Sequence, residues 1–269
     1  MTYQHLLIEK NGAVATLWLN RPDKLNALSA DMWEDIPGAV EALGEDTEVR
    51  VIVVAGKGDA FTVGIDVGML ASLAPDGRSQ AAANKALYGK IRELQHTVSV
   101  FAESDKPVVA AIHGFCLGAG MDLATACDIR LCSSDAVFSI RETRMGLVAD
   151  VGTLQRLPEI IGSGHVAELA FTGTDIDAAR AKEIGLVNSV QPDHESLMGY
   201  ATDLAQRIAD NSPLVLAGVK RVLQANRGRT VEEALDYVAH WNSAYLLSND
   251  LFEATSAFAE KRKPEFRGE

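Results

Sequence analysis

Two segments of the chain share one design, in which an apolar strand leads into a turn rich in small residues and then into a helix. The first runs from Val51 to Leu70 and contains GKG at 56–58 and FTVGID at 61–66. The second runs from Pro107 to Ala126 and contains HGFCLGAGMD at 113–122. Glycine lets the backbone approach a ligand closely, and a helix start leaves N–H groups free. Two such turns brought together can direct two amides at one oxygen, as an oxyanion hole does.

Spacing alone leaves the purpose of these turns open. For a single turn of this kind, glycines that merely allow a tight bend are the simpler interpretation. A dinucleotide site is a weaker alternative, because the stretch from Gly118 to Gly120 lacks the third glycine of that fingerprint and no acidic residue follows at the ribose position.

The order of the expected elements is typical of an α/β protein with a helical C-terminal region. Short apolar, β-rich runs predict strands at 13–19, 49–55, 107–112, 129–132 and 136–140. Apolar residues at helical spacing predict a helix over 80–103.

A second early helix is expected over 29–43, where Pro37-Gly38 should kink or split it. Thr230 and Glu233 form a capping-box start for a helix that reaches about residue 247. A last helix is expected near 250–263 and ends in basic residues.

Composition excludes several classes of protein. A net charge of -12 argues against nucleic acid or an anionic membrane as a partner, since both select for basic surfaces. Three cysteines with no CxxC pair argue against a disulfide framework or a zinc site, and no apolar run approaches the length of a membrane span. The N-terminal residues resemble neither a signal peptide nor a transit peptide, so we expect a cytoplasmic protein.

Several motifs in the right order resemble the crotonase (enoyl-CoA hydratase/isomerase) superfamily over about residues 5–263. They are NRPDKLNAL at 20–28, FTVGID at 61–66, HGFCLGAGMDL at 113–123, CDIR at 127–130 and GTLQRLP at 152–158. The resemblance implies a site for a coenzyme A thioester, with the backbone N–H groups of Ile65 and Ala119 as oxyanion donors. That family usually has glycine where Ala119 stands, but the donor is the main-chain N–H group, which alanine also has.

Three acidic residues match the positions at which members of this superfamily differ. Asp122 and Glu142 stand where hydratases carry two glutamates, and Asp150 stands where hydratases carry glycine. An Asp, Glu, Asp set resembles the pattern of Δ3,5-Δ2,4-dienoyl-CoA isomerases, enzymes of fatty acid degradation. By this analogy Asp150 removes the C2 proton, Glu142 protonates C6 and Asp122 tunes the pair, with no metal or redox cofactor. Taken alone, Asp150 would be interpreted as a helix cap.

The substrate also carries the phosphates of coenzyme A, which need local cations. Arg21 and Lys24 are the candidate cations, and Ala27 and Asp66 in the motifs around them are further candidate residues for binding the substrate. Phe258 and Lys261 match family positions that reach the nucleotide of a neighbouring subunit, although Lys261 to Lys263 could equally complement a helix dipole. We expect the segment 71–90, with Leu87 and Tyr88, to line the acyl tunnel, and His113 to be structural.

The expected fold is therefore a crotonase-like spiral of ββα turns over residues 1–205, followed by a helical trimerisation region over 206–269. The expected assembly is a homotrimer or a dimer of trimers. The leading hypothesis is a dienoyl-CoA isomerase, and a 2-enoyl-CoA hydratase or another isomerase of this type is the alternative. A non-catalytic acyl-CoA binder is less favoured, because a binder has no need for both an acid and a base.

Overall fold

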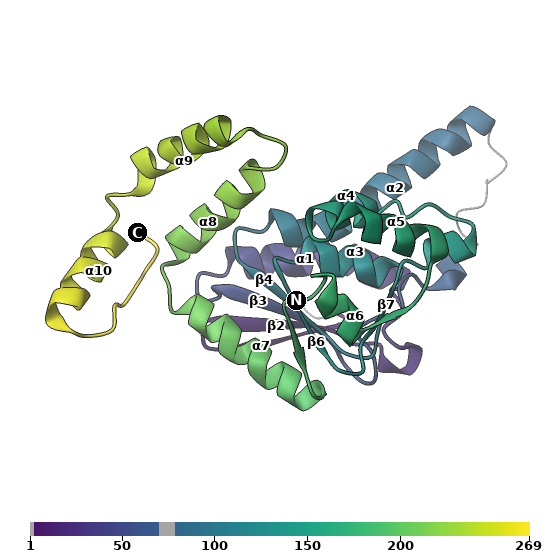
Figure 1. Cartoon of the computed structure of the whole chain (residues 1–269), viewed down its shortest axis with the longest axis horizontal. Coiled ribbons are helices and arrows are strands. Elements are labelled where there is room, and N and C mark those ends of the chain that lie inside the picture. Colours follow the sequence, from purple (N-terminus) through teal and green to yellow (C-terminus); the bar gives the residue numbers. More distant parts are fainter. Residues whose placement is uncertain (1–2, 70–78) are drawn as a thin grey trace.

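A six-stranded sheet forms the centre of the molecule in the computed structural model, which describes residues 3–69 and 79–269 (Figure 1). Its strand order is β1-β2-β3-β4-β6-β9, with β1 antiparallel to β2 and the other neighbours parallel. The strands are β1 (Leu6–Asn11), β2 (Val14–Leu19), β3 (Val51–Gly56), β4 (Val108–Ile112), β6 (Ile129–Ser133) and β9 (Ser189–Gln191). The runs expected at 13–19, 49–55, 107–112 and 129–132 are thus confirmed as strands.

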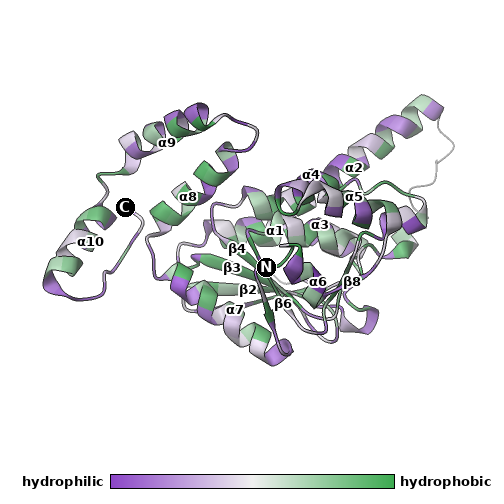
Figure 2. Cartoon of the chain, in the orientation of Figure 1, coloured by the Kyte–Doolittle hydropathy of each residue, from purple (hydrophilic) through white to green (hydrophobic). Residues whose placement is uncertain are grey.

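The central strands are apolar along their length, as the green ribbons of β2, β3 and β4 in Figure 2 show. In β3, Ile52 and Val54 belong to the large core that also includes residues of α1 (Ala30–Glu45), α2 (Gln80–Glu103) and α3 (Ala119–Ala126). Val51 and Val53 point the other way, into a smaller core under α7 (His194–Ala209). Alternation along a strand therefore gives the sheet two buried faces.

A second, three-stranded sheet turns the chain into a spiral. It comprises β5 (Phe115–Leu117), β7 (Val137–Ser139) and β8 (Ile176–Asp177) in the order β5-β7-β8. Each turn of the spiral contributes a strand to the large sheet, a segment to the small sheet and then a helix, as β4, β5 and α3 do in succession. Thr62 supplies the small-sheet segment of the preceding turn through a bridge to Cys116. These are the ββα turns expected from the sequence.

The expected break in α1 does not occur, because the helix is continuous from Ala30 to Glu45 with Pro37 inside it. Proline has no N–H for the carbonyl four residues earlier, which belongs to Trp33. The Thr97 hydroxyl of α2 donates to that carbonyl at 2.8 Å and replaces the missing bond. A tertiary contact therefore stabilises a helix that the local sequence disfavours.

Three helices at the C-terminus form an arm that extends away from the sheet (Figure 1). They are α8 (Pro213–Ala225), α9 (Val231–Tyr245) and α10 (Asn249–Glu260). The capping box predicted at Thr230 and Glu233 is present, and α10 ends at Glu260, three residues before the expected end. The boundary expected after residue 205 falls inside α7, whose last residue, Ala209, is still buried against the sheet.

The remaining helices, α4 (Thr153–Arg156), α5 (Ser163–Thr172) and α6 (Ala178–Glu183), lie between β7 and β9 in the chain. Among the helices of residues 3–69 and 79–269, none combines the length and the apolar character that crossing a membrane requires.

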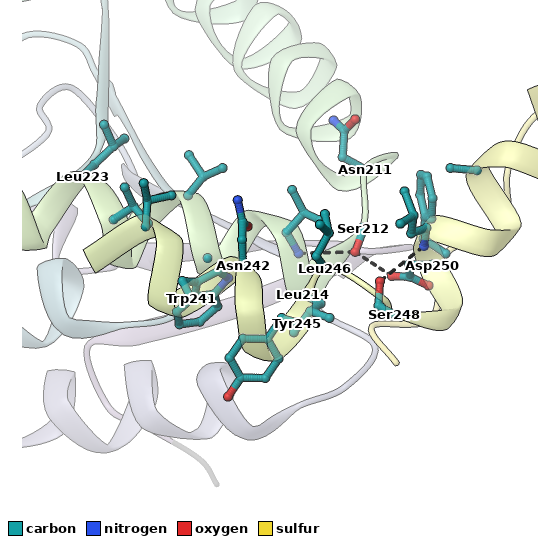
Figure 3. A pocket seen from close by; sticks show the side chains of 18 residues that line it. Asn211, Ser212, Leu214, Leu223, Trp241, Asn242, Tyr245, Leu246, Ser248 and Asp250 are labelled. Carbon is teal, nitrogen blue, oxygen red and sulfur yellow. Dashed lines mark hydrogen bonds between the residues drawn. The ribbon is translucent and has the colours of Figure 1, made fainter. Parts of the chain in front are cut away.

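The arm surrounds an apolar cavity of about 500 Å³. Buried polar contacts hold the arm to the core. Figure 3 shows Trp241, Tyr245 and Leu246 of the α9 end around this cavity, with Ser212 bonded to Asp250 beside it. Many large apolar side chains of the arm stay exposed in the single chain, among them Leu223, Leu235, Leu247, Phe252 and Phe258.

Lys220 on α8 joins the arm to the core. Its side chain is only 5% exposed, and Nζ donates to the carbonyl oxygens of Phe101 at 3.0 Å and Lys106 at 2.9 Å. It also forms an ion pair with Asp128 at 2.8 Å. A buried cation with three acceptors is costly to remove, because the two carbonyl oxygens lose this donor and Asp128, which still accepts from the Val108 amide, loses its counter-charge.

We expect Lys220→Met to lower the free energy of unfolding by about 3 kcal/mol, since breaking a buried ion pair leaves uncompensated polar groups. Arg221→Met is the matched control, because Arg221 pairs with Asp105 in an exposed ion pair and its loss should cost less than about 1 kcal/mol. Urea unfolding at one fixed protein concentration measures both. Equal losses for the two variants would contradict this role of Lys220.

Candidate active site

The two glycine-rich turns are joined to each other by main-chain hydrogen bonds. Phe61 N–H donates to the carbonyl oxygen of His113 at 2.8 Å, and Thr62 N–H donates to that of Phe115 at 2.9 Å. Leu117 N–H donates back to the Thr62 carbonyl oxygen at 3.1 Å. Segments that lie more than fifty residues apart in the sequence therefore form one rigid platform.

Gly64 allows the closest approach within this platform. Its φ is +91°, and a Cβ there would lie 2.6 Å from the carbonyl oxygen of Leu117 and 3.1 Å from the amide nitrogen of Ala119. No side chain fits in that space. The next amide, that of Ile65, and the amide of Ala119 at the start of α3 donate to no acceptor among residues 3–69 and 79–269. The sequence-predicted pair of donors is thus brought to adjacent backbone positions with both N–H groups free.

A cavity of about 310 Å³ opens beside these two amides. Ile65, Ala119 and all three predicted carboxylates, Asp122, Glu142 and Asp150, line it. The rest of its wall is largely apolar and comes from α1, α2, β5, the segment after β3 and the segment between β7 and α4. The apolar lining residues are Trp33, Val63, Val67, Ile91, Leu94, Leu117, Met145, Leu147, Val148 and Val151. An apolar pocket with a few convergent polar groups is the usual form of a small-molecule site.

Asp122 is the most enclosed of the carboxylates. It lies in the first turns of α3 with no solvent exposure, and its Oδ1 accepts from the Thr153 hydroxyl at 2.7 Å and from the Thr153 amide. Burial raises the pKa of Asp122 to about 6, although both bonds from Thr153 and the charge of Arg156 act in the opposite direction. The side chain can therefore change its protonation state near neutral pH.

Glu142 begins a short 3-10 helix, Glu142–Met145, after β7. Burial, followed by the nearby charge of Asp122, raises its pKa to about 7, with Asp150 adding a smaller effect. Gly118 lies directly beside this side chain, since a Cβ at 118 would be in ordinary contact with Oε1 of Glu142 at 3.4 Å. At neutral pH the carboxyl group of Glu142 is thus a competent proton donor.

Asp150 lies on the loop before α4 and is the most exposed of the three. Its carbonyl oxygen accepts from Nε2 of Gln95 on α2 at 2.6 Å, and partial burial raises its pKa. The capping alternative for Asp150 is wrong: the residue that caps α4 is Gly152, and no side chain caps that helix. The carboxylate of Asp150 is therefore available to the cavity.

Four of the expected substrate-binding residues lie together around the loop that follows β2: Arg21, Lys24, Ala27 and Asp66. Arg21 donates to Asp66 Oδ2 at 2.7 Å and to the carbonyl oxygen of Ala27 at 3.1 Å. The Arg21 bond is the main cause of the lowered pKa of Asp66. Lys24 is exposed beside them and adds a positive charge. This cluster adjoins Ile65 through the chain but is not part of the cavity wall.

Phe258 and Lys261 are not near the cavity of their own chain. Both lie on or just after α10 in the arm, at the opposite end of Figure 1 from α2. Phe258 is 88% exposed. Their contact with the nucleotide of a neighbouring subunit stays a prediction from the sequence.

The tunnel expected over residues 71–90 is only partly described. Residues 71–78 lie outside the described ranges, and Leu87 and Tyr88 are exposed and do not line the cavity, whereas Lys90 does. His113 lies outside the cavity, with Nε2 bonded to the Gly58 carbonyl oxygen and its ring stacked on His194 at 3.8 Å.

Sequence reasoning missed two parts of the site. Thr153, which binds Asp122, belongs to the GTLQRLP motif, but no pattern in the sequence indicates its contact with a residue 31 positions earlier. The apolar wall formed by Met145, Leu147 and Val148 was also missed, although these residues stand between two of the acidic positions.

Comparison with known proteins gives matches over nearly the whole chain. A Delta(3,5)-Delta(2,4)-dienoyl-CoA isomerase, peroxisomal, of Arabidopsis thaliana is 44% identical over 97% of this chain and 95% of its own length. A mitochondrial protein of the same name from Dictyostelium discoideum is 43% identical over 98% of this chain and 92% of its own length. The crystal structure of an enoyl-CoA hydratase from Bacillus anthracis superposes with a TM-score of 0.90 at 30% identity, covering 99% and 100% of the two chains.

These structural similarities confirm the expected crotonase fold, including its C-terminal helices. The model of the enoyl-CoA hydratase/isomerase family matches residues 9–269. On both grounds, the chain belongs to the enoyl-CoA hydratase/isomerase (crotonase) family.

Proposed function

We propose that this protein converts a 3,5-dienoyl-CoA to the 2,4-dienoyl-CoA in fatty acid degradation. The observation that carries the proposal is the presence of three carboxylates in one cavity beside two free amides. The names of the relatives at 43–44% identity support it. The substrate is an acyl thioester of coenzyme A, and the reaction relocates a proton and needs no metal or redox cofactor.

The reaction needs an acid and a base that are well separated. Removal of a proton from C2 sends its electron pair into the adjacent thioester carbonyl, which gives an enolate conjugated with the diene. Return of that pair and protonation of C6 give the 2,4-diene, so one proton leaves and one enters. Asp150 is the base, Glu142 is the acid, and Asp122 is the charge that keeps Glu142 protonated.

The amides of Ile65 and Ala119 hold the thioester oxygen while it carries negative charge. Each donor of such a pair lowers the barrier by roughly 3 kcal/mol, because it is fixed before the charge develops. Neither amide loses an internal hydrogen bond when the substrate enters, since neither makes one among the described residues.

The remaining binding residues serve the coenzyme A portion. Arg21 and Lys24 supply positive charge for the phosphates, and Asp66 and the Ala27 carbonyl orient Arg21. Phe258 and Lys261 contact the nucleotide of a neighbouring subunit. This assignment requires a homotrimer or a dimer of trimers, in which the exposed apolar side chains of the arm are covered.

A 2-enoyl-CoA hydratase is the second candidate. The placement of Asp122 and Glu142 in one cavity favours it, because two carboxyl groups can activate and position a water molecule. A solved structure at 30% identity is named as an enoyl-CoA hydratase. Asp150 separates the two candidates, since hydration has no need for a third carboxylate at the C2 side.

We also propose a cytoplasmic location. It is supported by the three cysteines, which are all buried free thiols, as suits a reducing compartment. The relatives reported above carry the words peroxisomal and mitochondrial in their names, and these words apply to those proteins.

We expect Asp150→Asn to lower kcat on 3,5-dienoyl-CoA by about 10²-fold or more, because the variant keeps the shape of the side chain and loses the base. KM should change little. The ultraviolet absorbance of the conjugated 2,4-dienoyl product measures the rate. Asp105→Asn, at an exposed carboxylate outside the cavity wall, is the matched control and should keep the parent rate. Rapid hydration of crotonyl-CoA by the parent protein without dienoyl turnover would overturn the proposal in favour of a hydratase.

The pH dependence of kcat should be bell-shaped. Activity requires ionised Asp122, so the rate rises as the pH passes through about 6. It also requires protonated Glu142, so the rate falls as the pH passes through about 7. A pH series of dienoyl turnover tests this, and Glu142→Gln should abolish the falling limb together with most of the rate. A rate that keeps rising above neutral pH would contradict the role of Glu142.

We expect Leu247→Glu with Phe252→Glu to dissociate the assembly, because a carboxylate in an apolar interface is costly to desolvate. These side chains are 79% and 57% exposed in the single chain. Sedimentation equilibrium at micromolar concentration measures the mass. Phe171→Glu, at an 80% exposed position on α5, is the matched control and should leave the mass unchanged. A monomeric parent protein would refute the proposed assembly.

A further inference from the structure

The two oxygens of the Asp122 carboxylate have different surroundings. Oδ1 accepts two hydrogen bonds, from the Thr153 amide at 2.5 Å and from the Thr153 hydroxyl at 2.7 Å. Oδ2 is buried and has no hydrogen-bond partner among the described residues. A buried carboxylate oxygen without a partner is unfavourable unless a ligand or a proton occupies it during function.

Thr153 is fixed in the position that this contact requires. It is the first residue of α4 and is 1% exposed, so its side chain is enclosed together with that of Asp122. A residue at this helix position has no carbonyl partner within the helix, and its amide is therefore free to donate outward. One residue thus supplies both donors to the same oxygen.

We propose that Thr153 is a positioning residue for the isomerase: it holds Oδ1 of Asp122 with its amide and hydroxyl, so that the unpaired Oδ2 is left as the charge that keeps Glu142 protonated. The inference rests on the function proposed above and extends it to a residue outside the acidic set. Thr153 itself does not line the cavity.

The electrostatic surroundings agree with this role. The two bonds from Thr153 are the largest effects that lower the pKa of Asp122, and they oppose its burial. Arg156 on α4 acts in the same direction, whereas Asp150 acts in the opposite one. Of the other titratable groups that interact with Asp122, Glu142 is affected by its charge, and Cys116 on β5 is a neutral thiol because burial raises its pKa.

The test compares Thr153→Val with Thr153→Ser. Valine keeps the volume and the amide but removes the hydroxyl, so kcat should fall by about tenfold while KM stays within about twofold. The rising limb of the pH profile should move to higher pH by about one unit, because Asp122 then ionises less readily. Serine restores the hydroxyl and should return both kcat and the limb to those of the parent. Thr153→Ala replaces the valine variant if that variant does not fold.

Thr125→Val is the matched control. The Thr125 hydroxyl is also buried and also donates to Asp122, but to its main-chain carbonyl oxygen at 3.0 Å and not to the carboxylate. This variant should leave the rising limb in place even if it unfolds at a lower temperature. An equal movement of the limb in both variants, or an unmoved limb in Thr153→Val, would overturn the inference.

A measurement without substrate separates this inference from the proposed reaction. Carboxyl-carbon NMR titration of the ligand-free protein, with Asp122→Asn to assign the signal, should show a higher pKa for Asp122 in Thr153→Val than in the parent or in Thr125→Val. That result with no dienoyl turnover by the parent would refute the isomerase while upholding the control of Asp122 by Thr153. An unchanged pKa of Asp122 in Thr153→Val, together with dienoyl turnover by the parent, would overturn the role of Thr153 and leave the isomerase in place.

Discussion

The main-chain pairing of the two glycine-rich turns is the contact on which the rest of the site depends. Thr62 is central to it, because its amide and its carbonyl oxygen both bond to the second turn, and its hydroxyl donates to the Asn26 carbonyl oxygen at 2.6 Å. The pairing places Ile65 beside Ala119 and fixes where α3 begins. The start of α3 in turn fixes Asp122, three residues further along that helix. Backbone geometry thus comes first, and the acidic side chains follow from it.

The same apolar walls that make the cavity suitable for an acyl chain also set its acid–base chemistry. Burial is the largest cause of the raised pKa at Asp122, Glu142 and Asp150 alike. The extent of burial decreases from Asp122 to Asp150, so three residues of the same chemical class acquire different proton affinities. Hydrogen bonds then adjust each value separately, as those from Thr153 do at Asp122. Separation of pKa values among neighbouring carboxyl groups is how one site holds an acid and a base at the same pH.

Local patterns were enough to predict much of the fold. The apolar runs of β3 and β4, the stripe of α2 and the capping box of α9 each depend on residues within one element, and each was found where expected. The strands β1, β5, β8 and β9 were not predicted, because β5, β8 and β9 have three residues or fewer and the exposed, half-polar β1 has no apolar run; β7 is equally short but was found within the run 136–140. The continuity of α1 could not be predicted either, since its gap at Pro37 is filled by Thr97 from another helix. In the site, the motifs located every carboxylate, whereas the partner of Asp122 depended on a contact across 31 residues.

The hydrogen bond from the Thr97 hydroxyl to the Trp33 carbonyl oxygen also constrains the wall of the acyl pocket. Trp33 on α1 and Leu94 on α2 both contribute to the pocket wall, and the bond from Thr97 to the Trp33 carbonyl joins these two helices. A substitution at position 37 that restores the helical bond leaves Thr97 with acceptors, because a carbonyl oxygen accepts two bonds and the Glu93 carbonyl lies 3.2 Å away, whereas a substitution at 97 leaves the Trp33 carbonyl without a donor. The hydroxyl at position 97 is therefore the constrained member of the pair, and the wall that Trp33 and Leu94 contribute to the pocket depends on it.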